Sequence, residues 1–149
     1  MSTSRTLVQL RSALAELAEA RRVLNFSNAR VSALSSDFRT WSPDEAERVE
    51  AFLARFSRGV DLLTNKTLRS LFRHELEPEG SVLDRIHLAQ KRGLIPDSER
   101  MRALKELRNR IAHDYSGGDT GAFLELARQE TEFLNSCAEA TRLYSERYL

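Results

Sequence analysis

Cysteine is nearly absent from the sequence, and so is any long apolar run. Cys137 is the only cysteine, which excludes a disulfide within the chain and a cysteine-based zinc site. No apolar run approaches the roughly 20 residues that a helix needs to cross a bilayer, and the charged, amphipathic N-terminal segment is unlike a signal peptide. We therefore expect a cytoplasmic protein with no membrane partner.

Net charge is also close to zero, because 23 lysines and arginines are balanced by 22 aspartates and glutamates. The formal charge of +1 excludes a basic field over the whole molecule of the kind that attracts nucleic acid. Charged residues still make up 30% of the chain, and their signs alternate along it, which is typical of the solvated faces of helices. Any contact with RNA would therefore need a local basic patch.

Proline and glycine are scarce, and no segment alternates apolar and polar residues for long enough to indicate a strand. The breakers are Pro43, Pro78, Pro96 and the glycines at positions 59, 80, 93, 117, 118 and 121. They divide the chain into long blocks with helical periodicity, and 149 residues fit one domain of ordinary size. The sequence predicts an all-α fold, a single antiparallel bundle of about five helices over residues 1–149.

The first predicted helix runs from about Thr3 to Phe38, because leucines recur along it at three- and four-residue steps. Arg21 and Asn28 interrupt this apolar stripe. Either the helix breaks near residues 25–28, or it is continuous and carries polar groups into the interior. We favour a single long helix.

The second predicted helix begins at a clear capping signal. Ser42 is a good N-cap, Pro43 suits the first helical position, and Glu45 can complete a capping box. The helix is expected to end around residues 75–77, which makes it about 50 Å long at 1.5 Å per residue. Two long N-terminal helices of this kind favour an elongated antiparallel bundle.

Three further helices are predicted from capping residues and glycine breaks. They are expected over Ser81–Arg92, from Asp97 or Ser98 to residues 113–115, and from Asp119 or Thr120 to Tyr148. The end of the fourth helix carries the residues of greatest chemical interest.

Arg108, Asn109 and His113 close the fourth predicted helix just before a serine–glycine turn. A histidine titrates near neutral pH and can act as a general acid or base, whereas the fork of an arginine matches phosphate oxygens. The asparagine can orient either of them. No metal-ligand cluster accompanies these residues and no cofactor is implied, so the combination suits metal-independent cleavage of an RNA phosphodiester.

One motif supplies only one histidine, His113, while cleavage needs both an acid and a base. A homodimer that brings two motifs together would supply the second histidine. The sequence therefore favours a site that two subunits share.

Asp61 and Arg110 are the candidate supporting residues. Asp61 lies next to the apolar stripe of the second helix, where it either orients a motif side chain or is an ordinary solvated residue. Arg110 either pairs with Glu106, four residues earlier, or binds phosphate. The main residues also have simpler interpretations: Arg108 could be a surface arginine, and His113 could only cap the end of the helix.

A second set of basic residues lies outside the motif. It comprises Lys66, Arg69, Arg73 and Arg85. These side chains could extend a phosphate-binding groove or could line ordinary solvated faces, and the sequence leaves both alternatives open.

The motif resembles that of HEPN-domain proteins of the HepT type, the helical partners of minimal nucleotidyltransferases in bacterial toxin–antitoxin pairs. The signature of this family is an arginine followed a few residues later by a histidine, with asparagine after the arginine and tyrosine shortly after the histidine in the HepT branch. Arg108, Asn109, His113 and Tyr115 fill these four places. The similarity covers roughly residues 44–115, including the segments Arg55-Phe56, Asp61-Leu62-Leu63, Leu83-Asp84-Arg85-Ile86 and Lys91-Arg92-Gly93-Leu94-Ile95.

The resemblance implies a HEPN-like helical bundle that dimerises, so that two motifs face a shared cleft. It implies an endoribonuclease toxin in which His113 transfers protons, Arg108 stabilises the phosphate and Asn109 orients them. It also implies neutralisation by a cognate nucleotidyltransferase antitoxin, which in some pairs transfers AMP to the motif tyrosine, here Tyr115. The alternative functions are a non-catalytic module that binds a nucleotide or the partner enzyme, and a purely structural helical dimer.

Overall fold

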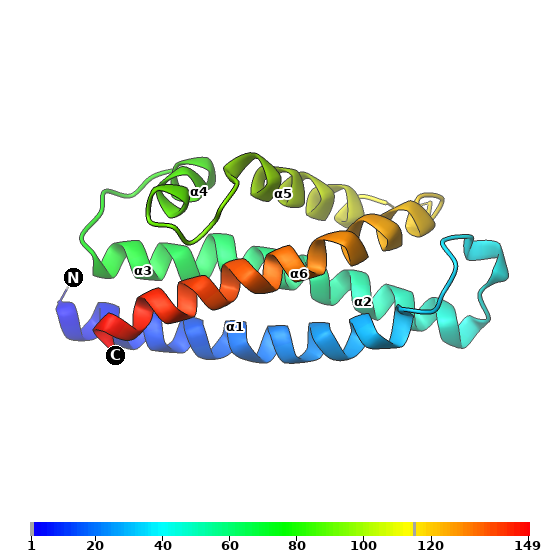
Figure 1. Ribbon diagram of the computed structural model, residues 1–149, viewed down its shortest axis with the longest axis horizontal. Helices are drawn as coiled ribbons and strands as arrows, with labels where there is room; N and C mark the ends of the chain where they lie inside the picture. The colour runs from blue at the N-terminus through cyan, green and yellow to red at the C-terminus, as the bar shows by residue number, and fades with distance from the viewer. Residues whose placement is uncertain (1, 115) are drawn as a thin grey trace.

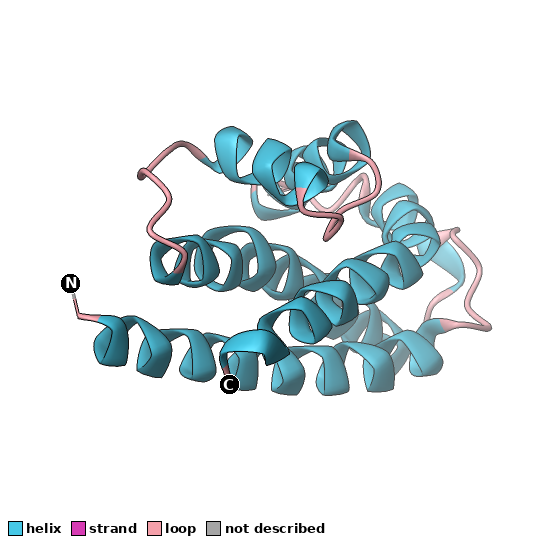
Figure 2. Cartoon of the chain, turned by 60° about the vertical axis from the view of Figure 1, so that its left-hand side comes forward, coloured by secondary structure: helices cyan, strands magenta, loops and turns pink. Residues whose placement is uncertain are grey.

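The computed structural model describes residues 2–114 and 116–149, and within these ranges it contains helices and no strand (Figures 1 and 2). The prediction of an all-α fold is confirmed. The helices are α1 (Thr3–Val31), α2 (Pro43–Asp61), α3 (Leu68–His74), α4 (Val82–Lys91), α5 (Ser98–Ala112) and α6 (Thr120–Ser145), with short 3₁₀ turns at Phe38–Thr40 and Glu146–Tyr148. Tyr115, the predicted modification site, lies outside the described residues.

A π-helical turn at Leu62–Thr67 joins α2 and α3 into one continuous helix. In this turn the backbone N–H of Leu68 donates to the carbonyl of Leu63, five residues back, whereas an α-helix would use the carbonyl four residues back. The extent of the second predicted helix is confirmed, since α3 ends at His74. The π turn itself was not predicted.

The two helices for which the sequence predicts serine caps, α2 and α4, both begin with a capping box. The Ser42 Oγ accepts from the backbone N–H of Glu45 at 3.1 Å, and the Glu45 carboxylate accepts from the Ser42 N–H at 3.0 Å. Ser81 and Asp84 form the same reciprocal pair at the start of α4. Each box satisfies backbone donors that would otherwise lack partners.

The first helix is continuous through its polar positions, as predicted, but the predicted end at Phe38 is wrong because α1 ends at Val31. Arg21 causes no break, since its guanidinium donates to Asn135 and Glu139 on α6 at 3.2 and 3.0 Å. The helix ends where short polar side chains bond to nearby backbone and compete with helical hydrogen bonds. The Ser35 Oγ, for example, accepts from the backbone N–H of the residue two positions later at 3.0 Å.

The helices form an elongated bundle in which α1 lies antiparallel to the continuous α2–α3 helix (Figure 1). The last helix, α6, crosses both, and α4 and α5 cover the side of α2–α3 that faces away from α1 (Figures 1 and 2). One apolar core connects all of these layers, with large fully buried side chains that include Phe52, Phe56, Leu68, Ile86 and Met101. The end of α5 therefore lies at the opposite end of the bundle from the two chain termini (Figure 1).

A buried carboxylate ties the end of α3 to the C-terminal turn. The Glu75 side chain is only 8% exposed and accepts hydrogen bonds from the hydroxyls of Tyr144, at 2.5 Å, and Tyr148. Arg92 approaches the same carboxylate at 3.4 Å, and the His74 ring packs edge-on against Tyr148. The carboxylate thus joins α3, the end of α4 and the end of α6.

Leu76 follows Glu75 in a left-handed conformation, with φ of 63°. The N–H of Glu77 donates to the Phe72 carbonyl at 2.9 Å, and the N–H of Leu76 donates to the Arg73 carbonyl at 3.1 Å. This is the Schellman arrangement, whose left-handed position usually holds glycine, as Gly93 does after α4 with φ of 77°. The leucine is also 84% exposed, so no burial compensates for its backbone strain.

We expect Leu76→Gly to stabilise the fold by about 0.5–1 kcal/mol, because relief of the left-handed strain exceeds the entropic cost of glycine. The measurement is the midpoint of urea unfolding. Leu143→Gly is the matched control, since Leu143 is also exposed but lies inside α6. That change should destabilise by about 1 kcal/mol, and equal losses in both variants would contradict the prediction.

Candidate functional site

The motif lies on the last turn of α5, whose orientation is set by its apolar face. Met101, Leu104 and Leu107 are buried against the bundle. Arg108 is consequently half-buried next to α2, whereas Asn109, Arg110 and His113 are exposed. The end of α5 therefore presents its arginine toward the bundle and its other polar groups to solvent.

Asp61 on α2 holds Arg108 in place. The Arg108 Nε donates to the Asp61 Oδ2 at 2.7 Å, and the Lys105 Nζ donates to the Oδ1 at 3.1 Å. The side chains of Asp61 and Arg108 are 29% and 32% exposed, which is enough shielding to favour a fixed geometry over a mobile surface pair. Of the two interpretations of Asp61, the structure supports the one in which it orients a motif side chain.

The guanidinium of Arg108 lines a hollow between α2, α5 and the start of α6, whose other walls include Leu53, Ser57 and Ile111. An arginine has five N–H donors. One contacts Asp61, and one donates to the Asn109 Oδ1 at 3.4 Å. Among the described residues the other donors have no partner, so they can donate to two phosphate oxygens.

His113 lies at the C-cap of α5, where its backbone N–H donates to the Asn109 carbonyl at 3.1 Å. The imidazole lines a second hollow together with Arg110, Asp119 and Phe123. The capping position matches the simpler interpretation of this histidine, because a cation is favoured at a helix C-terminus. The same position also leaves the histidine exposed at the surface.

Arg110 stacks over the ring of Phe123, with its guanidinium carbon 5.3 Å from the ring centre. Glu106, its expected partner, instead approaches Arg102 at 3.7 Å. The Glu106 alternative therefore has no support in the structure. The cation–π contact fixes Arg110 next to the hollow that His113 lines.

Arg108 and His113 do not line the same hollow. Asp114 and Ser116 border both hollows and so mark the boundary between them. Among the described residues, the arginine and the histidine therefore line two adjoining hollows at the end of α5.

The turn after the motif is fixed by local hydrogen bonds and by a close backbone approach. Gly117 has φ of 73°, which favours glycine, and its carbonyl accepts from the Thr120 hydroxyl at 2.8 Å. A Cβ on Gly121 would lie 1.8 Å from the Ser36 carbonyl oxygen. The segment between α1 and α2 is thereby packed directly against the start of α6, beside the motif.

Lys105 belongs to this cluster of charged residues and was not predicted from the sequence, although its position carried a signal. It precedes Arg108 by three residues and so shares its face of the helix, and its side chain is only 16% exposed. Lys105 and Arg108 together place two cations on one carboxylate, which leaves this cluster with a net positive charge.

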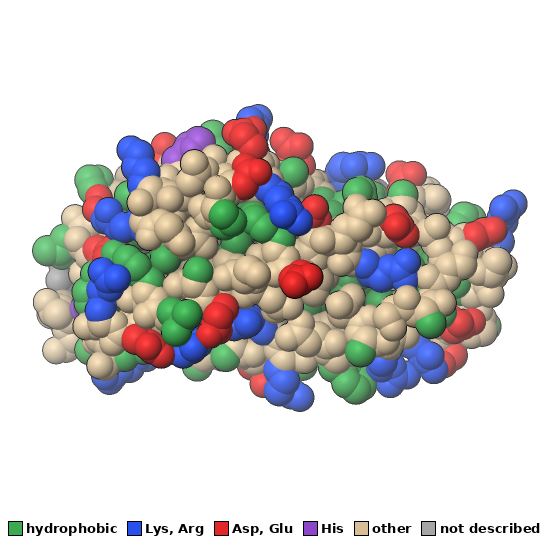
Figure 3. Space-filling model, in the orientation of Figure 1, with side chains coloured by type: hydrophobic (Ala, Val, Ile, Leu, Met, Phe, Trp, Pro, Cys, Tyr) green, Lys and Arg blue, Asp and Glu red, His purple; other side chains and the backbone are tan. Residues whose placement is uncertain are grey.

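The visible surface carries basic and acidic side chains interspersed, without a broad region of one sign (Figure 3). Within residues 2–114 and 116–149, no group of three His, Cys, Asp or Glu side chains is placed to hold a metal ion. No helix in the same ranges is both long enough and apolar enough to span a bilayer.

Comparisons of the chain with protein-family models, with curated proteins and with solved structures find no match.

Proposed function

We propose that this protein is a metal-independent endoribonuclease toxin that acts as a homodimer and is neutralised by a minimal nucleotidyltransferase. The proposal rests on the HEPN-like motif, and the observation that carries it is the ion pair between Asp61 and Arg108. This pair holds an arginine, several of whose donors have no partner among the described residues, five positions before an exposed histidine. The ion pair fixes a group that can bind phosphate, and the histidine is a proton-transfer group that a second copy could bring to it.

In the proposed reaction the RNA 2′-hydroxyl attacks the adjacent phosphorus, and the bond from phosphorus to the 5′-oxygen breaks. One His113 accepts the proton from the 2′-hydroxyl, and the second donates a proton to the leaving oxygen. Arg108 stabilises the charge on the phosphate oxygens. Asn109 orients the guanidinium through the contact at 3.4 Å.

The separation of Arg108 and His113 into two hollows supports a site composed of two subunits. A second copy whose α5 end faces the first would add its His113 to the region of Arg108. Two-fold symmetry then supplies both the acid and the base. A dimer also doubles the local positive charge, which matters because the net charge of one chain is only +1.

The experiment that tests this function uses the purified chain and its partner nucleotidyltransferase. With a metal chelator present, the chain alone should cleave RNA. Preincubation with the partner and ATP should stop cleavage and add the mass of AMP to the peptide that contains Tyr115. Cleavage that persists after preincubation without any mass change would refute the regulatory part of the proposal.

The second candidate is a module that binds the partner enzyme or a nucleotide without cutting RNA. The observation in its favour is that the Asp61 carboxylate already neutralises part of the charge of Arg108 and Lys105. In this case no RNA is cleaved at any protein concentration, while a stable complex with the partner still forms.

A further inference from the structure

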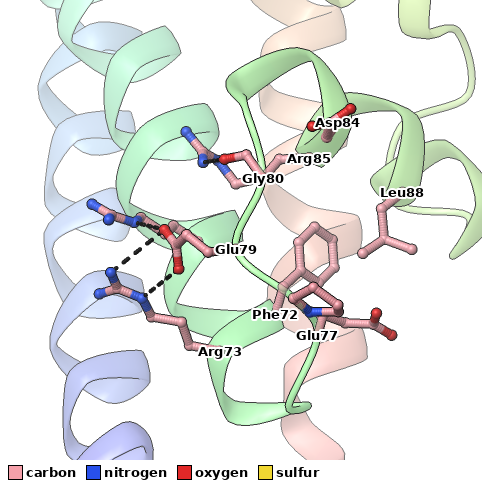
Figure 4. A pocket seen from close by; sticks show the side chains of 10 residues that line it. Phe72, Arg73, Glu77, Glu79, Gly80, Asp84, Arg85 and Leu88 are labelled. Carbon is pink, nitrogen blue, oxygen red and sulfur yellow. Dashed lines mark hydrogen bonds and ion pairs between the residues drawn. The ribbon is translucent and has the colours of Figure 1, made fainter.

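A second cluster of arginines lies around the loop between α3 and α4 (Figure 4), at the opposite end of the bundle from the end of α5 (Figure 1). Arg69 and Arg73 extend from the last turns of the long helix, and Arg85 extends from the first turn of α4. All three line one pocket, which also has an apolar wall formed by Phe72 and Leu88. Basic residues from two helices therefore converge on a concave surface.

Arg85 is held in a defined orientation by backbone oxygens. Its Nε donates to the Thr64 carbonyl in the π turn at 3.0 Å, and its Nη1 donates to the Gly80 carbonyl at 3.1 Å. Burial and the nearby charge of Arg69 lower the pKa of Arg85. This guanidinium is thus preorganised without a carboxylate hydrogen-bonded to it.

The other two arginines converge on a single carboxylate, that of Glu79. The Arg69 Nε donates to it at 2.5 Å. The Arg73 Nε donates to it at 3.1 Å (Figure 4). Hydrogen bonds from Arg69 and Arg73 keep the pKa of Glu79 below its ordinary value. The carboxylate therefore stays ionised at neutral pH and occupies the position that an anionic group would take between the two forks.

Glu79 is carried by a loop that is fixed at its ends. Glu75 anchors the first end through two tyrosine hydroxyls, and Ser81 anchors the second through its capping box. Between them the Glu79 side chain is 49% exposed. It can leave the arginines by a change of side-chain rotamer, because neither anchor involves Glu79.

We infer that Arg69, Arg73 and Arg85 form a binding site for a terminal phosphate group, and that Glu79 occupies this site when no ligand is present. Glu77 and Asp84 also line the pocket, but Glu77 pairs with Arg92 and Asp84 caps the start of α4. Once Glu79 leaves, three guanidinium groups face the ligand, and a dianionic terminal phosphate offers them more charge and one more free oxygen than a singly charged phosphodiester. The guanidinium forks of Arg69 and Arg73, already aimed at one acceptor, suit bidentate binding of its oxygens. This second site does not depend on the proposed ribonuclease activity.

Isothermal titration with inorganic pyrophosphate at constant ionic strength tests the inference. Glu79→Gln should bind pyrophosphate about tenfold more tightly than the unmodified chain, because an internal competitor with two charge-assisted hydrogen bonds is removed. Arg73→Ala, combined with Glu79→Gln to keep the site open, should reverse the gain. Circular dichroism establishes that each variant is folded.

Glu139→Gln is the matched control, because Glu139 also accepts from two arginines, Arg21 and Arg142. It changes the net charge by the same amount at a different place. An equal gain in Glu79→Gln and Glu139→Gln would overturn the inference, since the effect would then be one of net charge. No gain in Glu79→Gln would overturn it as well.

The source of the phosphate is distinguished with ATP and with a short RNA that carries either a 5′-phosphate or a 5′-hydroxyl. If Glu79→Gln binds only ATP more tightly, the ligand is a free nucleotide. If it binds the 5′-phosphorylated RNA more tightly, the ligand is an RNA end. Equal binding of the two RNAs, with the same dependence on Glu79, would refute the preference for a terminal phosphate.

Discussion

Replacing His113 with alanine is expected to lower the rate of RNA cleavage by about 10²–10⁴-fold, because a positioned proton-transfer group contributes that much to catalysis. Arg108→Ala should cost about 10²–10³-fold through lost stabilisation of the phosphate. Arg102→Ala is the control, since Arg102 lies on the same helix, is 53% exposed and makes only two long surface ion pairs. The cleavage rate is measured on a labelled RNA, and the rate of Arg102→Ala should equal that of the unmodified chain.

Mixing subunits tests whether two motifs share one site. If each site needs His113 from both chains, a ninefold excess of His113→Ala should reduce the activity per unmodified subunit about tenfold, because most such subunits then pair with a variant. An activity per unmodified subunit that stays constant across the titration would show that each motif acts alone. The amount of RNA cleaved by either chain on its own provides the baseline.

Glu75→Leu is expected to destabilise the fold by about 3 kcal/mol, the second large effect. The change leaves the Tyr144 and Tyr148 hydroxyls and the Arg92 guanidinium without the buried acceptor that joins them, and losing one partner of a buried charged network has a cost of this order. Urea unfolding measures the loss. Glu77→Leu is the control, because Glu77 also pairs with Arg92 but contacts neither tyrosine hydroxyl, and it should cost about 1 kcal/mol or less.

The same network predicts how stability changes with pH. Burial by itself raises the pKa of Glu75, but the hydrogen bonds from Tyr144 and Tyr148, together with Arg92, outweigh burial and bring the pKa below its ordinary value of 4.5. The unfolded chain then binds this proton more readily, so the stabilisation by Glu75 is complete above pH 4.5 and is lost as the pH falls through the folded pKa. The difference between the unmodified chain and Glu75→Leu should therefore shrink in acid.

At high pH the tyrosines act in the opposite direction. Burial and the hydrogen bond to Glu75 raise the pKa of Tyr144 and of Tyr148 above the ordinary value of 10. Their contribution is complete below pH 10 and is lost as the pH rises through the folded pKa values. The free energy of unfolding, plotted against pH, should thus show a plateau at neutral pH and fall in acid and in alkali. Tyr148→Phe should weaken the fall in alkali.

The features that the sequence predicted correctly depend on residues close together in the chain. Ser42 with Glu45 and Ser81 with Asp84 are separated by three residues, so their capping boxes follow from local chemistry. The positions of α4, α5 and α6 follow likewise from caps and glycine breaks. The end of α1 was misplaced because its apolar stripe continues beyond Val31, while short polar side chains after it accept hydrogen bonds from nearby backbone, as the Ser35 Oγ does.

The site was only partly predictable because its central contact joins distant residues. Asp61 and Arg108 are 47 positions apart, and nothing in the sequence decides between that pair and a solvated carboxylate. Glu79 was not singled out for the same reason: its contact with Arg69 spans a loop and has no helical spacing. The division of Arg108 and His113 between two hollows depends on how α5 packs, which residue types alone do not specify.

The π turn at Leu62–Thr67 sets the rotation of α3 relative to α2 within the longest helix. Asp61 lies just before it and faces α5, while Arg69 and Arg73 lie just after it and face the pocket beside α4. Each residue of a helix advances the direction of its side chains by about 100°, so losing one residue from this turn would rotate the two halves against each other. An insertion or deletion there would therefore change the relative orientation of the two surfaces without replacing any residue that forms them.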